Sequence, residues 1–225
     1  MNNTDYRNSK FKLNNEAHDD NNSHLNNIHS CLSECDYYTD SELNAMHVTI
    51  ELTCISTLSI NCRSISKKIE NIECSLKSLD NKFYFVGLTE TWLKPNDNSD
   101  IYNLPDYTLL SRPRTGKRGG GVGLYVTDKT SFKVRDDLVM NPVTCQYESL
   151  FIETVMHDHK VVIGVIYKPP ESNTDIFVAH FNDLMGKISK ERKHCILMGD
   201  FNIDLIKVDM QNRTKDFVHS KLITK

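Results

Sequence analysis

Short apolar segments of β-strand length alternate with turns and with two helical segments through most of residues 47–204. Two stretches, 66–79 and the residues that follow Thr174, space their apolar side chains as one face of a helix. Each helix joins two strands, whereas hairpin-length loops join most of the other strands. The pattern therefore predicts an α/β sandwich with helices packed on the outside of its sheets. The expected strands occupy residues 48–52, 55–60, 83–88, 107–110, 121–126, 147–156, 160–167 and 196–198.

Residues 1–46 differ in composition from the rest of the chain. They contain ten asparagines and eight acidic residues against three basic ones, with almost no apolar periodicity. Such a stretch cannot bury enough apolar surface to offset the entropy lost on ordering, so we expect a disordered Asn-rich acidic tail. Residues 47–225 are expected to form one domain. The whole chain has a net charge of −3 and the domain about +2, which permits a phosphate-rich partner without requiring one.

No segment has the features of a targeting or membrane-spanning sequence. The longest apolar run, 161–167, is much shorter than the roughly 20 residues that a membrane helix needs. The N-terminus lacks the apolar stretch of a signal peptide. The seven cysteines include no Cys-x-x-Cys pair, which favours free thiols in a reducing compartment. We therefore expect an intracellular protein without a membrane partner.

Four of the expected strands end directly in polar side chains, namely Asn61, Glu90, Tyr167, and Asp200 with Asn202. A rigid strand followed at once by a functional group is the layout by which a sheet positions a site. Each residue alone is also explained as a cap, a turn residue or a strand edge. Together they supply two carboxylates, two amides and a phenol, a set suited to magnesium-assisted phosphoester hydrolysis.

At these same positions the sequence resembles a known family. The matching stretches are 59–64 (Ser-Ile-Asn-Cys-Arg-Ser), 88–93 (Leu-Thr-Glu-Thr-Trp-Leu), Arg112 with 119–126, 165–170 (Val-Ile-Tyr-Lys-Pro-Pro) and 198–202 (Met-Gly-Asp-Phe-Asn). Their order and spacing resemble the endonuclease/exonuclease/phosphatase superfamily, and within it the apurinic-type endonuclease domain of non-LTR (LINE-type) retrotransposons. The resemblance implies a four-layered α/β sandwich of the DNase-I-like type and a Mg²⁺- or Mn²⁺-dependent enzyme that nicks DNA.

The resemblance also implies a role for each polar strand end. Glu90 would bind the divalent ion with help from Asn61, and Asp200 would be the general base that orients or deprotonates the attacking water. Asn202 would hold the scissile phosphate or the nucleophile, and Tyr167 would donate a hydrogen bond to the phosphate or the leaving oxygen. The expected catalytic set is thus Asp200, Asn202, Tyr167 and Asn61, with Glu90 and Asn61 at the metal.

A basic loop precedes the glycine run 119–123. Arg112, Arg114, Lys117 and Arg118 place four bases within seven residues. The loop is either simply solvated or contacts the sugar-phosphate backbone of DNA, an interaction that is independent of sequence and sensitive to salt. The glycine run lacks the following Lys-Ser or Lys-Thr of a P-loop, so no nucleotide cofactor is expected. It is better explained as a place where backbone packs closely on backbone.

One part of the family pattern is missing. The pattern normally closes with a Ser-Asp-His block near the C-terminus, but here Asp158 and His159 lie in an expected hairpin turn, and Asp216 and His219 in an expected helix. We therefore expect a domain that is truncated at its C-terminus and lacks its final strands. Whether the chain is an enzyme stays open between three alternatives. These are a DNA endonuclease acting in the nucleus, a truncated non-catalytic remnant and, less favoured, a phosphatase of the same superfamily.

Overall fold

The computed structural model describes residues 39–45, 55–80, 82–140 and 147–203, and these form two four-stranded sheets. In the first sheet β1 and β2 are parallel and the other neighbours are antiparallel. In order across that sheet the strands are β1 (Thr57–Asn61), β2 (Phe85–Thr89), β4 (Val122–Thr127) and β3 (Tyr107–Arg112). The second sheet has β7 and β8 parallel and contains β5 (Phe132–Val134), β6 (Glu148–Met156), β7 (His159–Tyr167) and β8 (His194–Asp200), in that order.

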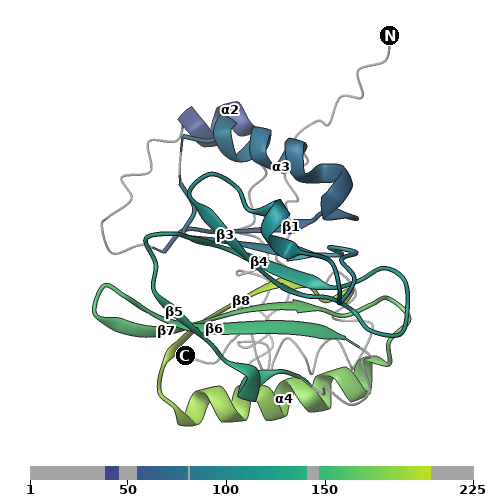
Figure 1. Cartoon of the computed structure of the whole chain (residues 1–225). Coiled ribbons are helices and arrows are strands. Elements are labelled where there is room, and N and C mark those ends of the chain that lie inside the picture. Colours follow the sequence, from purple (N-terminus) through teal and green to yellow (C-terminus); the bar gives the residue numbers. More distant parts are fainter. Residues whose placement is uncertain (1–38, 46–54, 81, 141–146, 204–225) are drawn as a thin grey trace, which may run out of the picture.

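Two long helices cover the outer faces of these sheets. Helix α3 (Ile65–Ser78) packs on the first sheet and helix α4 (Thr174–Lys190) on the second, so that the layers are helix, sheet, sheet, helix (Figure 1). The amide oxygen of Asn173 accepts hydrogen bonds from the backbone N–H groups of residues 175 and 176 and so caps the start of α4. The four-layered sandwich expected from the sequence is confirmed.

Strand side chains alternate between two buried surfaces, because each sheet has a helix on one face and the other sheet on its opposite face. In β2, Phe85 points between the sheets while Val86 and Leu88 face α3. In β7, Ile163 points between the sheets while Val162 faces α4. This double burial explains why the strands are continuous apolar runs. The layer between the sheets contains Phe85, Val122, Leu124, Val126, Leu150, Ile152, Val161, Ile163, Val165 and Met198.

Some short elements were not anticipated from the sequence. The short strand β5 and the 3-10 turns η1 (Ser99–Tyr102) and η2 (Asp136–Leu138) fall in segments without a clear period. Helix α2 (Asp40–Ala45) lies inside the stretch expected to be disordered. Its first turn is closed by Thr39 and Glu42, since the Glu42 carboxylate accepts from the Thr39 backbone N–H at 2.7 Å and the Thr39 hydroxyl accepts from the Glu42 N–H at 3.3 Å. Asn44 then docks the helix onto α3 by donating to the Ser78 carbonyl at 2.6 Å.

Several expectations fall on residues outside the described ranges. These are the tail before residue 39, the strand at 48–52 and the helix that contains Asp216 and His219. Among the described residues, no helix is long and apolar enough to cross a membrane.

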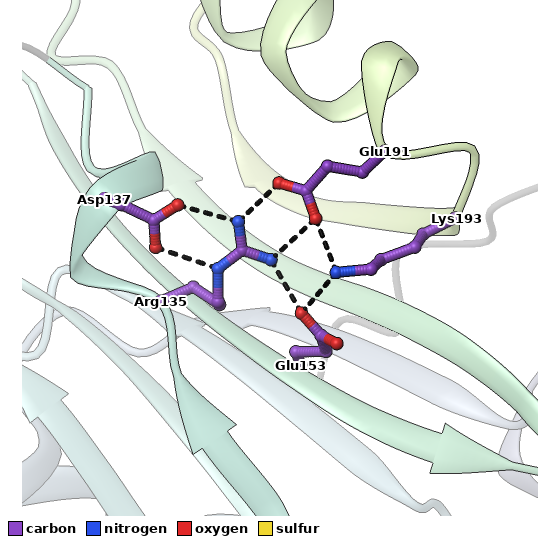
Figure 2. Close-up of polar contacts among 5 residues, drawn as sticks. All are labelled: Arg135, Asp137, Glu153, Glu191 and Lys193. Atoms are coloured by element: carbon purple, nitrogen blue, oxygen red, sulfur yellow. Dashed lines mark hydrogen bonds and ion pairs between the residues drawn. The ribbon is translucent and has the colours of Figure 1, made fainter.

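Five charged side chains join β6, η2 and the loop between α4 and β8 (Figure 2). Arg135 is central: its guanidinium donates to Asp137, Glu153 and Glu191. Lys193 forms ion pairs with Glu153 and Glu191. Because Arg135 is only 8% exposed, three carboxylates around it satisfy most of its N–H donors and offset the loss of water. We call these five residues the Arg135 network.

Candidate active site

The polar strand ends predicted from the sequence meet at one end of the sandwich. Asn61 ends β1 and Glu90 follows β2, while Tyr167 ends β7 and Asp200 ends β8. The parallel pairs β1–β2 and β7–β8 each stop together, since Asn61 is opposite Thr89 and Tyr167 is opposite Asp200. Each sheet therefore contributes one pair of functional groups to the same place.

Hydrogen bonds join these groups across the two sheets. The Asn61 amide nitrogen donates to Glu90 Oε1 and to Asp200 Oδ2, each at 3.0 Å. The Tyr167 hydroxyl donates to Glu90 Oε1 at 3.3 Å. The two carboxylates thus lie on either side of one amide group, although they are 110 positions apart in the sequence.

Gly199 allows β8 to deliver Asp200 and Asn202. Its φ is +133°, and a Cβ atom there would lie 1.9 Å from the Ile166 carbonyl oxygen, so only glycine lets β8 approach β7 so closely. The Asn202 backbone N–H donates to Asp200 Oδ1 at 3.1 Å, and its side chain donates to the Lys168 carbonyl at 2.8 Å. These contacts fix both side chains of the Asp-Phe-Asn turn on one side of the chain.

Phe201, between these two polar residues, turns the other way. Its ring packs against Phe177 and Phe181 of α4, with ring centroids 6.1 Å apart in both cases. The ring therefore faces the core around α4. The aromatic contact anchors the turn, so that Asp200 does not depend on its own hydrogen bonds alone.

Glu90 is held by an unusual stretch of backbone. Both Glu90 and Trp92 have left-handed φ angles, +56° and +58°, which cost energy in residues other than glycine and often occur at functional sites. The glycine run stabilises them, because the Trp92 N–H donates to the Gly120 carbonyl at 2.9 Å and the Thr91 N–H to the Gly121 carbonyl at 3.2 Å. The predicted close approach of backbone to backbone at the glycine run is therefore present.

Burial and charge set the protonation state of the phenol. Burial and the neighbouring Glu90 carboxylate raise the pKa of Tyr167 to about 12. The hydroxyl therefore keeps its proton at neutral pH and acts as a hydrogen-bond donor. Lys168, next in the chain, is only 1% exposed, and this burial lowers the pKa of its ammonium group.

The donor set fits a hard divalent cation. Mg²⁺ prefers one or two carboxylates and completes its coordination with waters and substrate phosphate oxygens. Glu90 and Asp200 provide two carboxylates bridged by one amide, and within the described residues neither is part of an ion pair. Both of these hydrogen bonds come from the side-chain nitrogen of Asn61, and neither involves its side-chain carbonyl oxygen. Among the described residues, no group of three or more His, Cys, Asp or Glu side chains is arranged so that it could hold a metal ion by itself.

A cavity with a volume of about 430 Å³ opens beside Asp200. Asn61, Asp200 and Asn202 form its polar wall, and Ser59, Thr89, Gly199, Phe201 and Ile203 complete the lining. The site is therefore open to a molecule larger than water.

The four bases of the loop before the glycine run have different environments. Arg112 pairs with Asp136, and Arg114 forms a two-pronged pair with Glu148 while lying over the Tyr167 ring, 5.6 Å from its centroid. Lys117 and Arg118 are exposed. The structure thus leaves the last two bases presented to solvent.

Two residues near the site were not singled out from the sequence. Trp92 is 37% exposed, and its indole N–H donates to Glu90 Oε2 at 3.4 Å. Glu148 holds Arg114. Trp92 lies two residues after Glu90, and this short spacing could have predicted that it lies near the site. No feature of the sequence around Glu148 predicts its contact with Arg114. Asp158 and His159 lie at the β6–β7 turn, at the other end of β7 from Tyr167.

A sequence profile described as the endonuclease/exonuclease/phosphatase family matches residues 58–222, well over half of the chain. The matched range includes all five polar residues at the strand ends, from Asn61 to Asn202. No similar sequence was found among curated proteins.

Solved structures with the same fold include proteins of several kinds. The human Nocturnin catalytic domain with bound sulfate aligns with a TM-score of 0.55 at 15% identity, over 75% of this chain and 69% of the other. An AP endonuclease from Archaeoglobus fulgidus aligns with a TM-score of 0.55 at 13% identity, over 74% and 71%. The endonuclease domain of TRAS1, a telomere-specific non-LTR retrotransposon, gives 0.52 at 11% identity, over 74% and 71%. At these identities the likeness shows the fold alone, a DNase-I-like sandwich of two sheets.

Proposed function

Because the chain belongs to the endonuclease/exonuclease/phosphatase family, we propose that its site hydrolyses phosphodiester bonds in DNA with the help of Mg²⁺ or Mn²⁺. One observation carries this proposal. Asn61 brings Glu90 of one sheet and Asp200 of the other onto a single amide group, next to a protonated phenol. A metal-binding carboxylate, a general base and a proton donor are the three groups that such a hydrolysis requires.

Each side chain has a separate task in the proposed reaction. Asp200, oriented by the Asn61 amide and the Asn202 N–H, would accept the proton of the attacking water. Tyr167 would donate its proton in a hydrogen bond to the phosphate or to the leaving oxygen, and its raised pKa keeps that proton available. Asn202, exposed beside Asp200, would contact the scissile phosphate or the nucleophile. A divalent ion held by Glu90 with the Asn61 carbonyl would supply positive charge to the phosphoryl group.

We further propose that the domain derives from the apurinic-type endonuclease of a non-LTR retrotransposon and nicks DNA in the nucleus. The combination of Thr-Glu-Thr-Trp-Leu at 89–93 and Gly-Asp-Phe-Asn at 199–202 supports this origin. Lys117 and Arg118, both exposed on the loop beside the site, would contact the sugar-phosphate backbone.

Nicking of supercoiled plasmid by the full chain tests the proposal. We expect relaxed circles to form with Mg²⁺ or Mn²⁺ and not with EDTA. Asp200→Asn should reduce the rate by roughly 10²- to 10⁴-fold, the usual contribution of a general base. Glu90→Gln should raise the Mg²⁺ concentration required for half-maximal rate.

Asp158→Asn is the matched control, because this acid lies in the turn at the far end of β7. It should leave the rate unchanged. Nicking at the wild-type rate by the Asp200→Asn protein would contradict the assignment of Asp200 as the general base. A folded wild-type chain that nicks nothing with either metal would favour the truncated, non-catalytic alternative. Hydrolysis of a phosphomonoester without nicking would favour the phosphatase.

A further inference from the structure

We propose that Glu148 is a positioning residue, which clamps Arg114 onto the face of Tyr167 and thereby fixes the distance between the two sheets at the site. The inference rests on the proposed function for its catalytic readout. Glu148 is a buried acid with no part in the proposed hydrolysis itself. The proposed clamp also gives Arg114 a task other than contact with DNA.

The register of the second sheet places Glu148 beside the site. Glu148 is the first residue of β6 and pairs with Tyr167 in the antiparallel β6–β7 ladder. Residues that are directly opposite in such a ladder point to the same face of the sheet, so the carboxylate and the phenol ring are neighbours. The Glu148 side chain is only 7% exposed. A buried carboxylate is costly without a partner, and Arg114 provides that partner.

Arg114 reaches Glu148 from the other sheet. It lies in the loop between β3 and β4, two residues after Arg112 at the end of β3. Its Nε and Nη2 nitrogens both donate to the Glu148 carboxylate, in the two-pronged arrangement that fixes the plane of a guanidinium. Burial lowers the pKa of Arg114, but the hydrogen bond and charge of Glu148 outweigh this and raise it. The cation is therefore permanent.

The surroundings of the guanidinium fit it closely. One face lies over the Tyr167 ring, 5.6 Å from its centroid, a cation–π distance. On another side the backbone of Gly120 is so near that an added Cβ would lie 2.3 Å from the guanidinium carbon. The φ of Gly120 is +68°, so glycine is also required for its conformation. The glycine run thus encloses Arg114 as well as supporting the Glu90 turn.

This arrangement matters because the catalytic groups come from both sheets. Asn61 and Glu90 belong to the first sheet, and Tyr167 and Asp200 to the second. The Arg114–Glu148 pair crosses between the same two sheets and contacts Tyr167 directly. Loss of the pair would free the ring and lengthen the 3.3 Å contact between the phenol and Glu90. Displacements of about 1 Å in an active site can cost 10²-fold in rate.

The kinetics of plasmid nicking distinguish a positioning role of Arg114 from a direct contact between Arg114 and DNA. We expect Arg114→Met and Glu148→Gln to lower kcat by roughly 10- to 100-fold and to leave KM and its salt dependence close to wild type. Arg118→Met, a change to an exposed base of the same loop, is the matched comparison. If Arg118 contacts phosphate, its loss should raise KM and reduce the slope of log KM against log salt by about one.

A double-mutant cycle tests whether Glu148 acts through Arg114. If it does, Glu148→Gln has no further effect on kcat in the Arg114→Met background, so the two losses do not add. Additive losses would overturn the proposal. So would a change in the salt slope with Arg114→Met, because that outcome identifies a contact with the DNA backbone. Arg114→Lys should rescue little, since an ammonium group lacks the planar fork.

An NMR readout does not depend on nuclease activity. The ring resonances of Tyr167, assigned by their absence in Tyr167→Phe, should shift in Arg114→Met and shift similarly in Glu148→Gln, while Arg118→Met leaves them in place. If Glu148→Gln leaves the Tyr167 signals unmoved, Glu148 does not hold Arg114 and the proposal is wrong. This measurement stays valid if the wild-type chain nicks no DNA, so the failure of the proposed function and the failure of this inference are distinguishable.

Discussion

Replacing Arg135 with methionine should destabilise the fold more than any other single charge deletion in the Arg135 network (Figure 2). Arg135 is 8% exposed and donates to three carboxylates. Methionine keeps much of the side-chain volume but leaves these acids facing one another, with only Lys193 to neutralise two of them. The change therefore removes the positive charge that makes the burial of the carboxylates tolerable.

The size of the effect follows from the exposure of the partners. Removing one member of a fully buried ion pair costs about 3–5 kcal/mol. Here Glu153 is 19% exposed, Glu191 27% and Asp137 62%, so water can solvate part of the released charge. We discount accordingly and expect Arg135→Met to lower the free energy of unfolding by about 2–3 kcal/mol.

Urea unfolding followed by far-UV circular dichroism measures this quantity. Arg112→Met is the control, because Arg112 also pairs with an aspartate but the pair is largely exposed, at 35% and 76%. Its loss should cost between 0 and about 1 kcal/mol. If Arg135→Met costs no more than the control, burial does not decide the strength of these ion pairs and the reasoning fails.

The same network predicts how stability depends on acid. Hydrogen bonds from Arg135 lower the pKa of Asp137 and of Glu191, each to about 2, below their ordinary values of 3.8 and 4.5. Carboxyls with a lowered pKa in the folded state stabilise it above the ordinary value, and this contribution is lost as the pH falls toward the folded value. Wild-type stability should therefore decrease between about pH 4.5 and pH 2, and Arg135→Met should remove much of that decrease. An unchanged pH profile in the variant would contradict this assignment.

Two further substitutions test the backbone and the core, again by urea unfolding. Gly121→Ala should cost about 2–4 kcal/mol, because φ is +82° and the new methyl group would lie 2.6 Å from the Thr91 hydroxyl oxygen. Gly116→Ala, with the same φ but nothing within 4 Å, should cost only about 1 kcal/mol; equal costs would show that packing plays no part. Phe177→Ala, fully buried on α4, should cost about 3–5 kcal/mol. Its neighbour Ile176, 40% exposed, should tolerate alanine within about 1 kcal/mol, and a reversed order would refute the burial pattern of the helix.

Much of the fold was predictable because local patterns carry it. Strands buried on both faces are continuous apolar runs, and the two long helices show a one-sided apolar stripe, so both are visible in any short window of sequence. Helix α2 was missed since its first turn depends on a capping pair and on a hydrogen bond to α3, not on apolar periodicity. A segment whose composition is typical of disorder can still contain a short helix that packs on the folded domain.

The sequence by itself determined which residues were candidates for the site. A polar group directly after a buried strand can be recognised locally. Asn61, Glu90, Tyr167 and Asp200 were predicted in this way, and hydrogen bonds join their side chains in the folded chain. Strand ends that share one edge of the sandwich bring such groups together without any further signal.

Only the tertiary structure decided which charges belong to the site and which face solvent. The loop bases are alike in sequence, yet Arg114 is enclosed by Glu148 and the glycine run while Lys117 and Arg118 remain exposed. Arg114 and Glu148 are 34 positions apart and lie on different sheets, so their pairing depends on how the sheets stack. Composition and periodicity describe one segment at a time, whereas the environment of a charge is set by segments that only the folded chain brings together.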